Sequence, residues 1–515
     1  MKLGLAQVNS TIGDLEGNVA RCLDAVERAE TLGADLVVFP EMVIPGYPPR
    51  DLLYDSSFIE ATLAATRDLA QKAKNNPPLL VGSIAHSGRS LTGHPGLYNV
   101  AYLLKDGEVH LAATKRLLPV YDVFLEPRWF LPGDFMPPIE IAGTRIGILI
   151  CEDMWDEGYP IHPPQELREA GADLLVCLSD LPFRKRAIEK RWHHARRHGL
   201  PLALVNLVGG NDDLIFDGHS FVLDKRGNLI TQLTGFEEDL RVVDVPPVTS
   251  PSWRYAVDDP LSMVEDVFRA LVLGLRDFAR KNGMRRAVIG LSGGIDSSVA
   301  AVLAKEALGA KNVTGVAIPS RYTDPRSTEC GKELAGALGI QFEIVEMESM
   351  HSSAEETLGS LLETGTSAEN IQARLRMLIL MSYVNRHGGF LVNTSNKTEL
   401  TVGYGTLYGD LAGAISPLGD LTKPEVYDMA RHINSTRNVI PPYVLERAPS
   451  AELKPGQIDP FDYDVFAPQM EKLVLANQSN PAMRQSEHKR QQFGIILKVS
   501  EKAFGSGRFI PVSKK

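Results

Sequence analysis

Cysteine is scarce in this sequence, with four among 515 residues: Cys22, Cys151, Cys177 and Cys330. They show no paired spacing, which argues against a disulfide framework and against a clustered zinc site. The pattern predicts reduced thiols and a cytoplasmic protein.

Long apolar runs are also missing. No run approaches the roughly 20 residues that span a bilayer, and the N-terminal MKLGLAQVNS lacks the apolar core and cleavage site of a signal peptide.

Positive charge is in deficit, because 54 Lys and Arg face 64 Asp and Glu, giving a net charge of −10. We therefore expect partners that are neither membranes nor nucleic acids.

The chain is too long for one core, and its pattern changes near the middle. Residues 1–245 alternate strand and helix signals with hairpin turns at 105–107 and 224–227, which predicts an α/β sandwich. The proline-rich stretch 246–260 is typical of a linker. Residues 261–515 predict parallel strands separated by helices, a doubly wound Rossmann-like sheet. The tail beyond about Ser435, rich in proline and polar residues, is expected to be loop-like.

A glycine-serine loop separates the apolar run Arg286–Leu291 from a predicted helix over 296–308. Backbone N–H groups at a helix N-terminus bind anions, and glycines allow a phosphate to come close. Asp296 adds a carboxylate for a metal. No lysine follows the glycines, so the loop is not GxxxxGK(S/T); the alternative is an ordinary capped Gly-Ser turn. The motif resembles the pyrophosphate loop of ATP pyrophosphatases. That resemblance implies that ATP binds Ser292, Gly293, Gly294, Ile295, Asp296, Ser297 and Ser298.

Three reactive residue types follow strand-like runs in the first half. Glu41 follows LVVFP, Lys115 follows HLAAT and Cys151 follows IGILI. A thiolate can attack an amide carbon, a carboxylate can carry the proton, and an ammonium can stabilise the oxyanion. The alternative is a buried strand cysteine with two surface charges. The segments FPEM, TKRLLP and CEDMW resemble the nitrilase superfamily, which implies a Glu41–Lys115–Cys151 catalytic triad.

Further positions resemble the glutaminase domain of glutamine-dependent NAD synthetases. Tyr47, Tyr121 and Glu126 stand at matching spacings, and the resemblance implies that they contact or support bound glutamine. One departure is the segment SDLPF, where Leu181 occupies the place of a glutamine-binding serine. Ser179 is the expected substitute.

The second half resembles the same family in ENIQARLR, TSNKTEL, PLGDLTK, PSAEL and HKR. Asp296 and Glu399 are expected to hold Mg²⁺, which typically takes one or two carboxylates plus substrate phosphates. The resemblance implies ATP contacts at Thr394, Lys423 and Ser450. It also implies contacts to deamido-NAD at Asn370, Arg374, Glu399, Asp410, His488 and Lys489.

Together these resemblances imply a nitrilase-like α-β-β-α sandwich (1–245), a linker (246–260) and an adenine nucleotide α-hydrolase-like domain (261–515). The implied reaction amidates deamido-NAD to NAD with glutamine or ammonia and ATP, through an adenylate, as the last step of NAD biosynthesis. A homo-oligomer is also implied. Two alternatives are another glutamine-fed adenylating enzyme, of the GMP- or asparagine-synthetase kind, and an ammonia-only synthetase with an inactive first domain.

Overall fold

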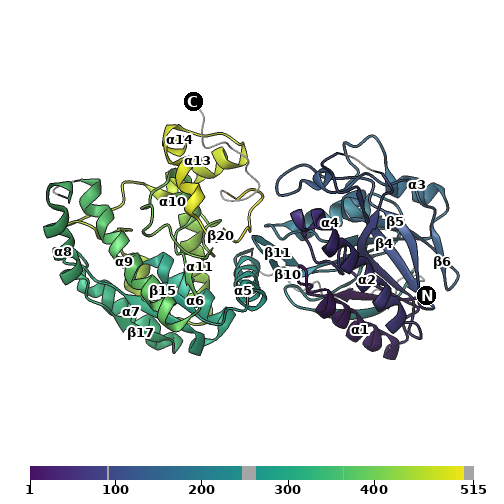
Figure 1. Cartoon of the computed structure of the whole chain (residues 1–515), viewed down its shortest axis with the longest axis horizontal. Coiled ribbons are helices and arrows are strands. Elements are labelled where there is room, and N and C mark those ends of the chain that lie inside the picture. The colour runs from purple at the N-terminus through teal and green to yellow at the C-terminus, as the bar shows by residue number, and fades with distance from the viewer. Residues whose placement is uncertain (90–91, 246–262, 363–364, 504–515) are drawn as a thin grey trace. The chain divides into compact units, whose positions relative to one another are not determined.

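The computed structural model describes residues 1–89, 92–245, 263–362 and 365–503 (Figure 1). The chain divides into two compact units, Met1–Asn211 with Ile215–Pro260, and Asp212–Leu214 with Leu261–Lys515. The expected linker, 246–260, lies outside the described residues. Within those ranges no helix has the length and apolar character needed to cross a membrane.

The first unit is built on two six-stranded sheets, ordered β14-β1-β2-β3-β4-β5 and β13-β12-β9-β8-β7-β6. Its helices are α1 (Leu15–Thr31), α2 (Ser56–Lys72), α3 (Pro163–Glu169) and α4 (Ala187–Arg196). Its strands are β1 (Lys2–Gln7), β2 (Leu36–Val38), β3 (Leu79–His86), β4 (Leu97–Lys105), β5 (Glu108–Thr114), β6 (Ile139–Ile141), β7 (Thr144–Ile150), β8 (Leu174–Ser179), β9 (Leu202–Asn206), β10 (Val208–Asn211), β11 (Leu214–Asp217), β12 (Phe221–Leu223), β13 (Leu229–Gln232) and β14 (Asp239–Asp244).

Alternation along the strands explains the layering of this unit. In β1, Leu3 and Leu5 join the core between the two sheets, whereas Ala6 joins a second core with α1 and α2. The two-residue period of a strand sends successive side chains to opposite faces. On the other sheet, α3 packs on β7, and Leu167 of α3 and Ala195 of α4 join the same hydrophobic cluster as the residues of β7, β8 and β9. The expected α-β-β-α sandwich is confirmed.

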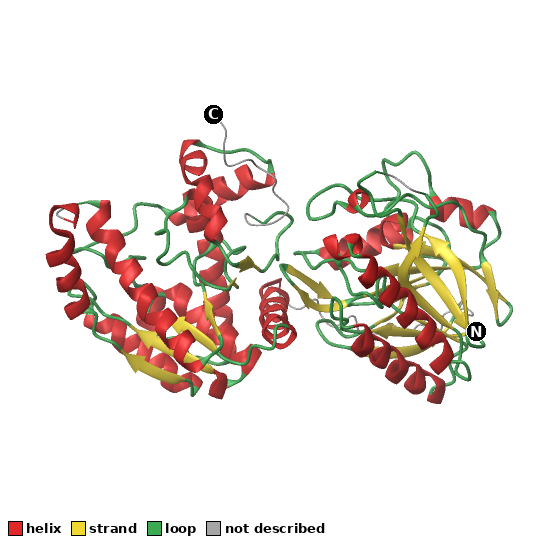
Figure 2. Cartoon of the chain, viewed as in Figure 1, coloured by secondary structure: helices red, strands yellow, loops and turns green. Residues whose placement is uncertain are grey.

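The second unit is built on one parallel sheet, ordered β17-β16-β15-β18-β19-β20 (Figure 2). Its strands are β15 (Ala287–Gly290), β16 (Val313–Ala317), β17 (Gln341–Ile344), β18 (Phe390–Val392), β19 (Ile415–Ser416) and β20 (Ile495–Ile496). Its helices are α5 (Met263–Lys281), α6 (Ile295–Leu308), α7 (Pro325–Leu338), α8 (Glu348–Leu358), α9 (Thr366–His387), α10 (Lys397–Val402), α11 (Lys423–Thr436), α12 (Pro442–Glu446), α13 (Tyr463–Leu475) and α14 (Pro481–Ser486).

The strand order reverses between β15 and β18, which confirms the Rossmann-like prediction. From β15 the chain winds through β16 to β17 and then returns to the other side of β15. Ligands of open parallel sheets bind at this switch point, outside the carboxyl ends of the strands. The loop that follows β15 contains Ser292–Ser298.

The expected loop-like tail was wrong. The chain beyond Ser435 contains α12, α13 and α14 and ends its described part after β20. Pro442 and Pro481 stand in the first turns of α12 and α14, where a missing N–H costs nothing. Two of the prolines that suggested loops therefore begin helices.

Candidate functional site

Three reactive side chains of the first unit follow the ends of strands from its two sheets. Glu41 lies in the turn after β2, Lys115 directly follows β5, and Cys151 directly follows β7 as the first residue of a 3₁₀ helix, Cys151–Met154. Cys151 has φ +46°, in the left-handed region that non-glycine residues rarely adopt. Such strained conformations cluster at functional sites, so the backbone independently points to Cys151.

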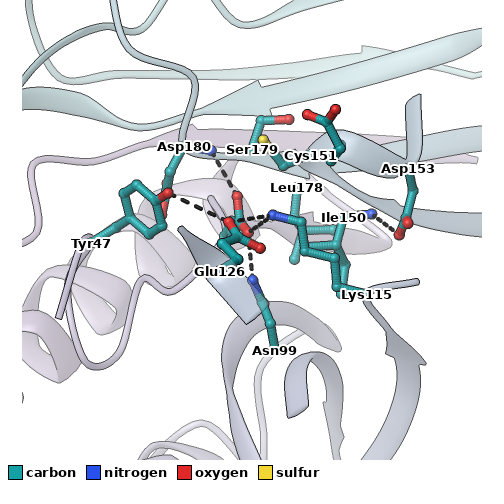
Figure 3. A network of polar contacts seen from close by, with 12 residues as sticks. Tyr47, Asn99, Lys115, Glu126, Ile150, Cys151, Asp153, Leu178, Ser179 and Asp180 are labelled. Carbon is teal, nitrogen blue, oxygen red and sulfur yellow. Dashed lines mark hydrogen bonds and ion pairs between the residues drawn. The ribbon is translucent and has the colours of Figure 1, made fainter. Parts of the chain in front are cut away.

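A sealed ion network surrounds Lys115 (Figure 3). Its Nζ donates to Oε1 of Glu41 at 2.8 Å and to Oε1 of Glu126 at 2.7 Å. The Lys115 side chain is 0% exposed, and those of Glu41 and Glu126 are 1% and 4% exposed. Asn99 Nδ2 also donates to Glu41, and the Tyr47 hydroxyl donates to Glu126 at 3.5 Å. Two predicted glutamine-site residues, Tyr47 and Glu126, thus belong to the same network as two triad residues.

The thiol of Cys151 is held in its neutral form. Burial raises the thiol pKa well above its ordinary value, and the negative charge of Glu41 raises it further. A neutral thiol is a poor nucleophile, so attack requires a base that removes its proton. Glu41, whose charge acts on the Cys151 thiol, is the base predicted from the sequence.

Asp153 fixes the nucleophile turn to the segment after Lys115. One carboxylate oxygen accepts the N–H groups of Arg116 and Leu117 at 3.0 and 2.9 Å, and the other accepts the N–H of Ile150 at 3.1 Å. Burial raises the pKa of Asp153 to about 6 despite these bonds. Asp153 is absent from the residues predicted from the sequence, although it stands two residues after Cys151 in CEDMW.

The remaining predicted glutamine contacts lie around this network. The Tyr121 hydroxyl donates to Oε2 of Glu152 at 2.9 Å, and Tyr121 is 43% exposed. Ser179 is wholly buried, with its hydroxyl 3.2 Å from the Cys177 thiol. Leu181 is buried as well. The structure thus gives the Ser179 hydroxyl one partner inside the chain already.

The phosphate-type loop of the second unit has the geometry expected of a tight strand-to-helix turn. Gly293 has φ +77°, and a Cβ there would lie 1.9 Å from the Ser327 carbonyl oxygen, so only glycine fits. The hydroxyls of Ser297 and Ser298 donate to the Gly294 carbonyl at 3.0 and 2.8 Å. Both hydroxyls therefore help to hold the first turn of α6.

A cavity of about 260 Å³ opens beside this loop. Residues at the carboxyl ends of β15, β16 and β18 line it, together with the segment 450–453. Among the predicted ATP contacts, Ser292, Gly294, Thr394 and Ser450 lie in its wall, as does Asp410. The cavity also contains Arg376, which donates to the Ile318 carbonyl at 3.1 Å and was not among the predicted residues.

A second lysine bridges two carboxylates at this loop. Lys423 Nζ lies 2.6 Å from Oδ2 of Asp296 and 3.2 Å from Oε1 of Glu399. Burial raises the pKa of Glu399 to about 7, the Lys423 charge opposes this rise, and the Asp296 charge adds to it. The two carboxylates converge on one cation and offer the oxygen donors that Mg²⁺ prefers. Across the described ranges no third His, Cys, Asp or Glu completes a metal cluster, so substrate phosphates and water would supply the other ligands.

The residues predicted to bind deamido-NAD gather on the loop 403–410. Asn370 accepts the Thr406 hydroxyl at 2.8 Å, and Arg374 donates to the Leu407 carbonyl at 3.1 Å. Lys489 Nζ donates to the carbonyls of Gly403 and Gly405 at 2.8 and 2.7 Å. Asp410 ends this loop, Glu399 lies shortly before it, and His488 is exposed beside Lys489. Helix α9, the loop 403–410 and the segment of Lys489 thus meet here, and Asp410 lies in the wall of the cavity.

Comparison with known proteins gives matches to each half of this chain and to its whole length. A carbon-nitrogen hydrolase model matches residues 2–255, and an NAD synthase model matches residues 267–503. A glutamine-dependent NAD(+) synthetase of Synechocystis sp. is 36% identical over 99% of this chain and 98% of its own length. The chain belongs to the family of glutamine-dependent NAD(+) synthetases.

Other glutamine-dependent NAD(+) synthetases are similarly close. The one from Thermotoga maritima is 35% identical over 100% of this chain and 99% of its own. A solved structure of a glutamine-dependent NAD+ synthetase from Acinetobacter baumannii, in complex with ADP, has a TM-score of 0.79 and 30% identity over 99% of this chain and 98% of that chain. Both the sequence order of the two units and their folds are thus those of this family.

Proposed function

We propose that this protein amidates deamido-NAD to NAD, using glutamine as nitrogen donor and ATP as the source of energy. The products are NAD, glutamate, AMP and pyrophosphate. One observation carries the proposal: a buried Glu41–Lys115 pair beside Cys151 occurs in the same chain as a cavity of about 260 Å³ at the switch point of a parallel sheet. The first releases nitrogen from an amide, and the second activates an acceptor.

In the first unit, Glu41 takes the thiol proton and the Cys151 sulfur attacks the carboxamide carbon. Lys115 stabilises the oxyanion that forms. Its ammonium has three N–H donors, of which two are used by Glu41 and Glu126, so one is available for the oxyanion. Glu41 then passes the proton to nitrogen, ammonia leaves, and water hydrolyses the thioester. Tyr47, Tyr121 and Ser179 are proposed to hold glutamine.

In the second unit, the N–H groups of the loop 292–298 and the start of α6 bind the ATP phosphates. Asp296 and Glu399 hold Mg²⁺, which neutralises phosphate charge when bound. Lys423, Thr394 and Ser450 are proposed to contact ATP; the relative from Acinetobacter baumannii was solved in complex with ADP. The nicotinate carboxylate of deamido-NAD attacks the α-phosphorus and releases pyrophosphate. Ammonia then attacks the adenylate and displaces AMP.

Deamido-NAD is proposed to bind at the loop 403–410. The residues bonded to this loop, Asn370, Arg374 and Lys489, are proposed to contact it, together with the neighbouring His488. These side chains supply amide and cationic groups suited to a dinucleotide. Their contacts with the loop tie the acceptor site to the ATP cavity through Asp410.

We propose domain limits of 1–245 and 261–515 and a homo-oligomeric, cytoplasmic enzyme. Leu378 and Met381, one turn apart on α9, are 57% and 37% exposed, and we propose that a second subunit covers them. The four cysteines are buried and unpaired, which suits a reducing compartment. Light scattering of the purified protein checks the oligomer.

A single assay tests the function. Purified protein receives deamido-NAD, ATP and Mg²⁺, with glutamine or ammonium as nitrogen source, and NAD is measured. We expect NAD from both sources, and none when deamido-NAD or ATP is omitted. NAD from ammonium alone would instead identify an ammonia-dependent synthetase with an inactive first unit.

A further inference from the structure

The ion network of Lys115 and Glu41 is bordered by buried oxygen atoms that lack a hydrogen-bond donor. Both carboxyl oxygens of Asp180, Oε2 of Glu126 and Oδ1 of Asn99 have no partner among the described residues. Asp180 directly follows β8 and is 0% exposed. Its backbone N–H donates to Oε2 of Glu41 at 3.2 Å, as Figure 3 shows. All four atoms can accept a hydrogen bond, so an N–H donor of a bound ligand would find acceptors here.

Glu41 has too few free lone pairs to satisfy a bound carboxamide. Its Oε1 already accepts from Asn99 at 2.5 Å and from Lys115 at 2.8 Å. Its Oε2 accepts the Asp180 N–H, which leaves one lone pair for the thiol proton. The nitrogen of a carboxamide brings two N–H donors, and these need other acceptors.

We propose that the carboxyl group of Asp180 binds the nitrogen of the substrate carboxamide and holds the ammonia that it becomes. This inference rests on the proposed function and concerns its first half. The thiol proton moves to Glu41, the sulfur–carbon bond forms, and Glu41 returns the proton to nitrogen. The carbon–nitrogen bond then breaks, its electron pair stays on nitrogen, and ammonia and the thioester result. Asp180 makes and breaks no covalent bond.

The chain on both sides of Asp180 is fixed before any substrate binds. The Leu181 N–H donates to Asn206 Oδ1 at 2.8 Å, and Arg191 Nη2 donates to the Leu181 carbonyl at 3.2 Å. Arg191 is itself paired with Asp217 at 2.7 Å, and both side chains are buried. The buried Asp180 carboxyl therefore cannot turn towards another partner, and its missing hydrogen bonds cost folding free energy. A bound N–H donor would remove this cost.

The charge balance favours a nitrogen ligand as well. Burial raises the pKa of the Asp180 carboxyl well above its ordinary value, and the Glu41 charge raises it further. This shift favours the neutral acid of Asp180, which limits the negative charge around Lys115. Even the neutral acid keeps an oxygen that accepts an N–H bond.

A pairing of enzyme variants with two substrates tests this assignment. Glutamine is compared with the γ-methyl ester of glutamate, which Cys151 can also cleave but which has no N–H on its leaving group. We expect Asp180→Ala to lower kcat/KM for glutamine by roughly 10- to 100-fold and for the ester by less than about threefold, because each lost hydrogen bond to the reacting group costs about tenfold. Asp180→Asn keeps one acceptor oxygen and should fall between.

The ester also reports whether the site has folded, since its hydrolysis needs Glu41, Lys115 and Cys151. Asp68→Asn makes the same chemical change on an exposed face of α2 and should leave both substrates unaffected. Equal losses on glutamine and ester, or full glutamine activity in Asp180→Ala, would overturn the assignment. A wild-type protein that makes NAD from ammonium but hydrolyses neither substrate would instead refute the proposed glutaminase, which keeps the two failures distinct.

Discussion

The two units contain the same arrangement of charges in different surroundings. In the first unit Lys115 bridges Glu41 and Glu126, and in the second Lys423 bridges Asp296 and Glu399. The first set is sealed, with carboxylates that are 1% and 4% exposed, whereas the carboxylates of the second are 18% and 16% exposed. The buried Lys115 ammonium has to stay in place, because moving it would leave two buried carboxylates without a counter-charge. The carboxylates of the second set reach water, and the proposed Mg²⁺ site relies on this difference.

The largest expected effect separates the two sites by nitrogen source. Cys151→Ala should reduce glutamine-dependent NAD formation by on the order of a thousandfold or more, because no other group attacks the amide. NAD formation from ammonium should stay within about twofold of the wild-type rate, since this reaction does not need the site of Glu41, Lys115 and Cys151. Cys22→Ala, which alters a buried cysteine on α1, is the control. Glutamine use by Cys151→Ala at near the wild-type rate would make Cys177 the next candidate.

Removing a carboxylate from the second set should affect both nitrogen sources. Asp296→Asn and Glu399→Gln are each expected to lower NAD formation by roughly 100- to 1000-fold, because stabilisation of phosphate charge by a metal is worth several kcal/mol. Glutamine hydrolysis measured alone should largely survive. Ammonium-dependent rates near wild type in both variants would refute the proposed metal site.

The two lysines should differ in their contribution to stability. Lys115→Met leaves two sealed carboxylates without a cation and should lower the free energy of unfolding of its unit by about 3–5 kcal/mol. Lys423→Met leaves carboxylates that reach water, and Asp296 keeps its bond from Asn396, so about 1–2 kcal/mol is expected. Hydrogen exchange in urea, followed separately for each unit, measures both. Equal losses would show that exposure does not distinguish the two sets.

The sealed set should also make stability depend on pH. Burial, reinforced by Glu41 and opposed by Lys115, raises the pKa of Glu126 from 4.5 to about 7. Between these values the unfolded chain releases a proton that the folded chain retains, so stability present at low pH is lost as the pH rises towards 7. The free energy of unfolding of Glu126→Gln, relative to that of the wild type, should therefore rise by about 2–3 kcal/mol between pH 4 and pH 7.5. Urea titrations across this range, with the exposed Glu27→Gln as control, check the sign.

The smallest expected effect concerns Ser179. The Ser179 hydroxyl contacts the Cys177 thiol and is proposed to bind glutamine as well. Ser179→Ala should then raise the glutamine KM by about five- to tenfold, because one hydrogen bond worth about 1 kcal/mol is lost. The ammonium-dependent rate should not change. An unchanged KM would remove Ser179 from the glutamine site and leave Asp180 as the polar contact from this segment.

The sequence predicted the parts of the fold and site that local pattern encodes. Glu41, Lys115 and Cys151 could be found because each follows an apolar run, and the loop 292–298 because its glycines lie between a strand and a helix. Asp180 and the Arg191–Asp217 pair could not, because only tertiary packing reveals that a charged residue is buried and what it faces. The hairpin β10–β11 was missed for a related reason, since its strands lie in a stretch rich in glycine, asparagine and aspartate rather than in an alternating pattern.

The neutral state of the Cys151 thiol has a consequence for oxidative stress. Peroxides oxidise thiolates much faster than thiols, and they need access to the sulfur. Cys151 is 3% exposed and is kept protonated until substrate and base act together. We therefore expect Cys151 to resist oxidation between turnovers.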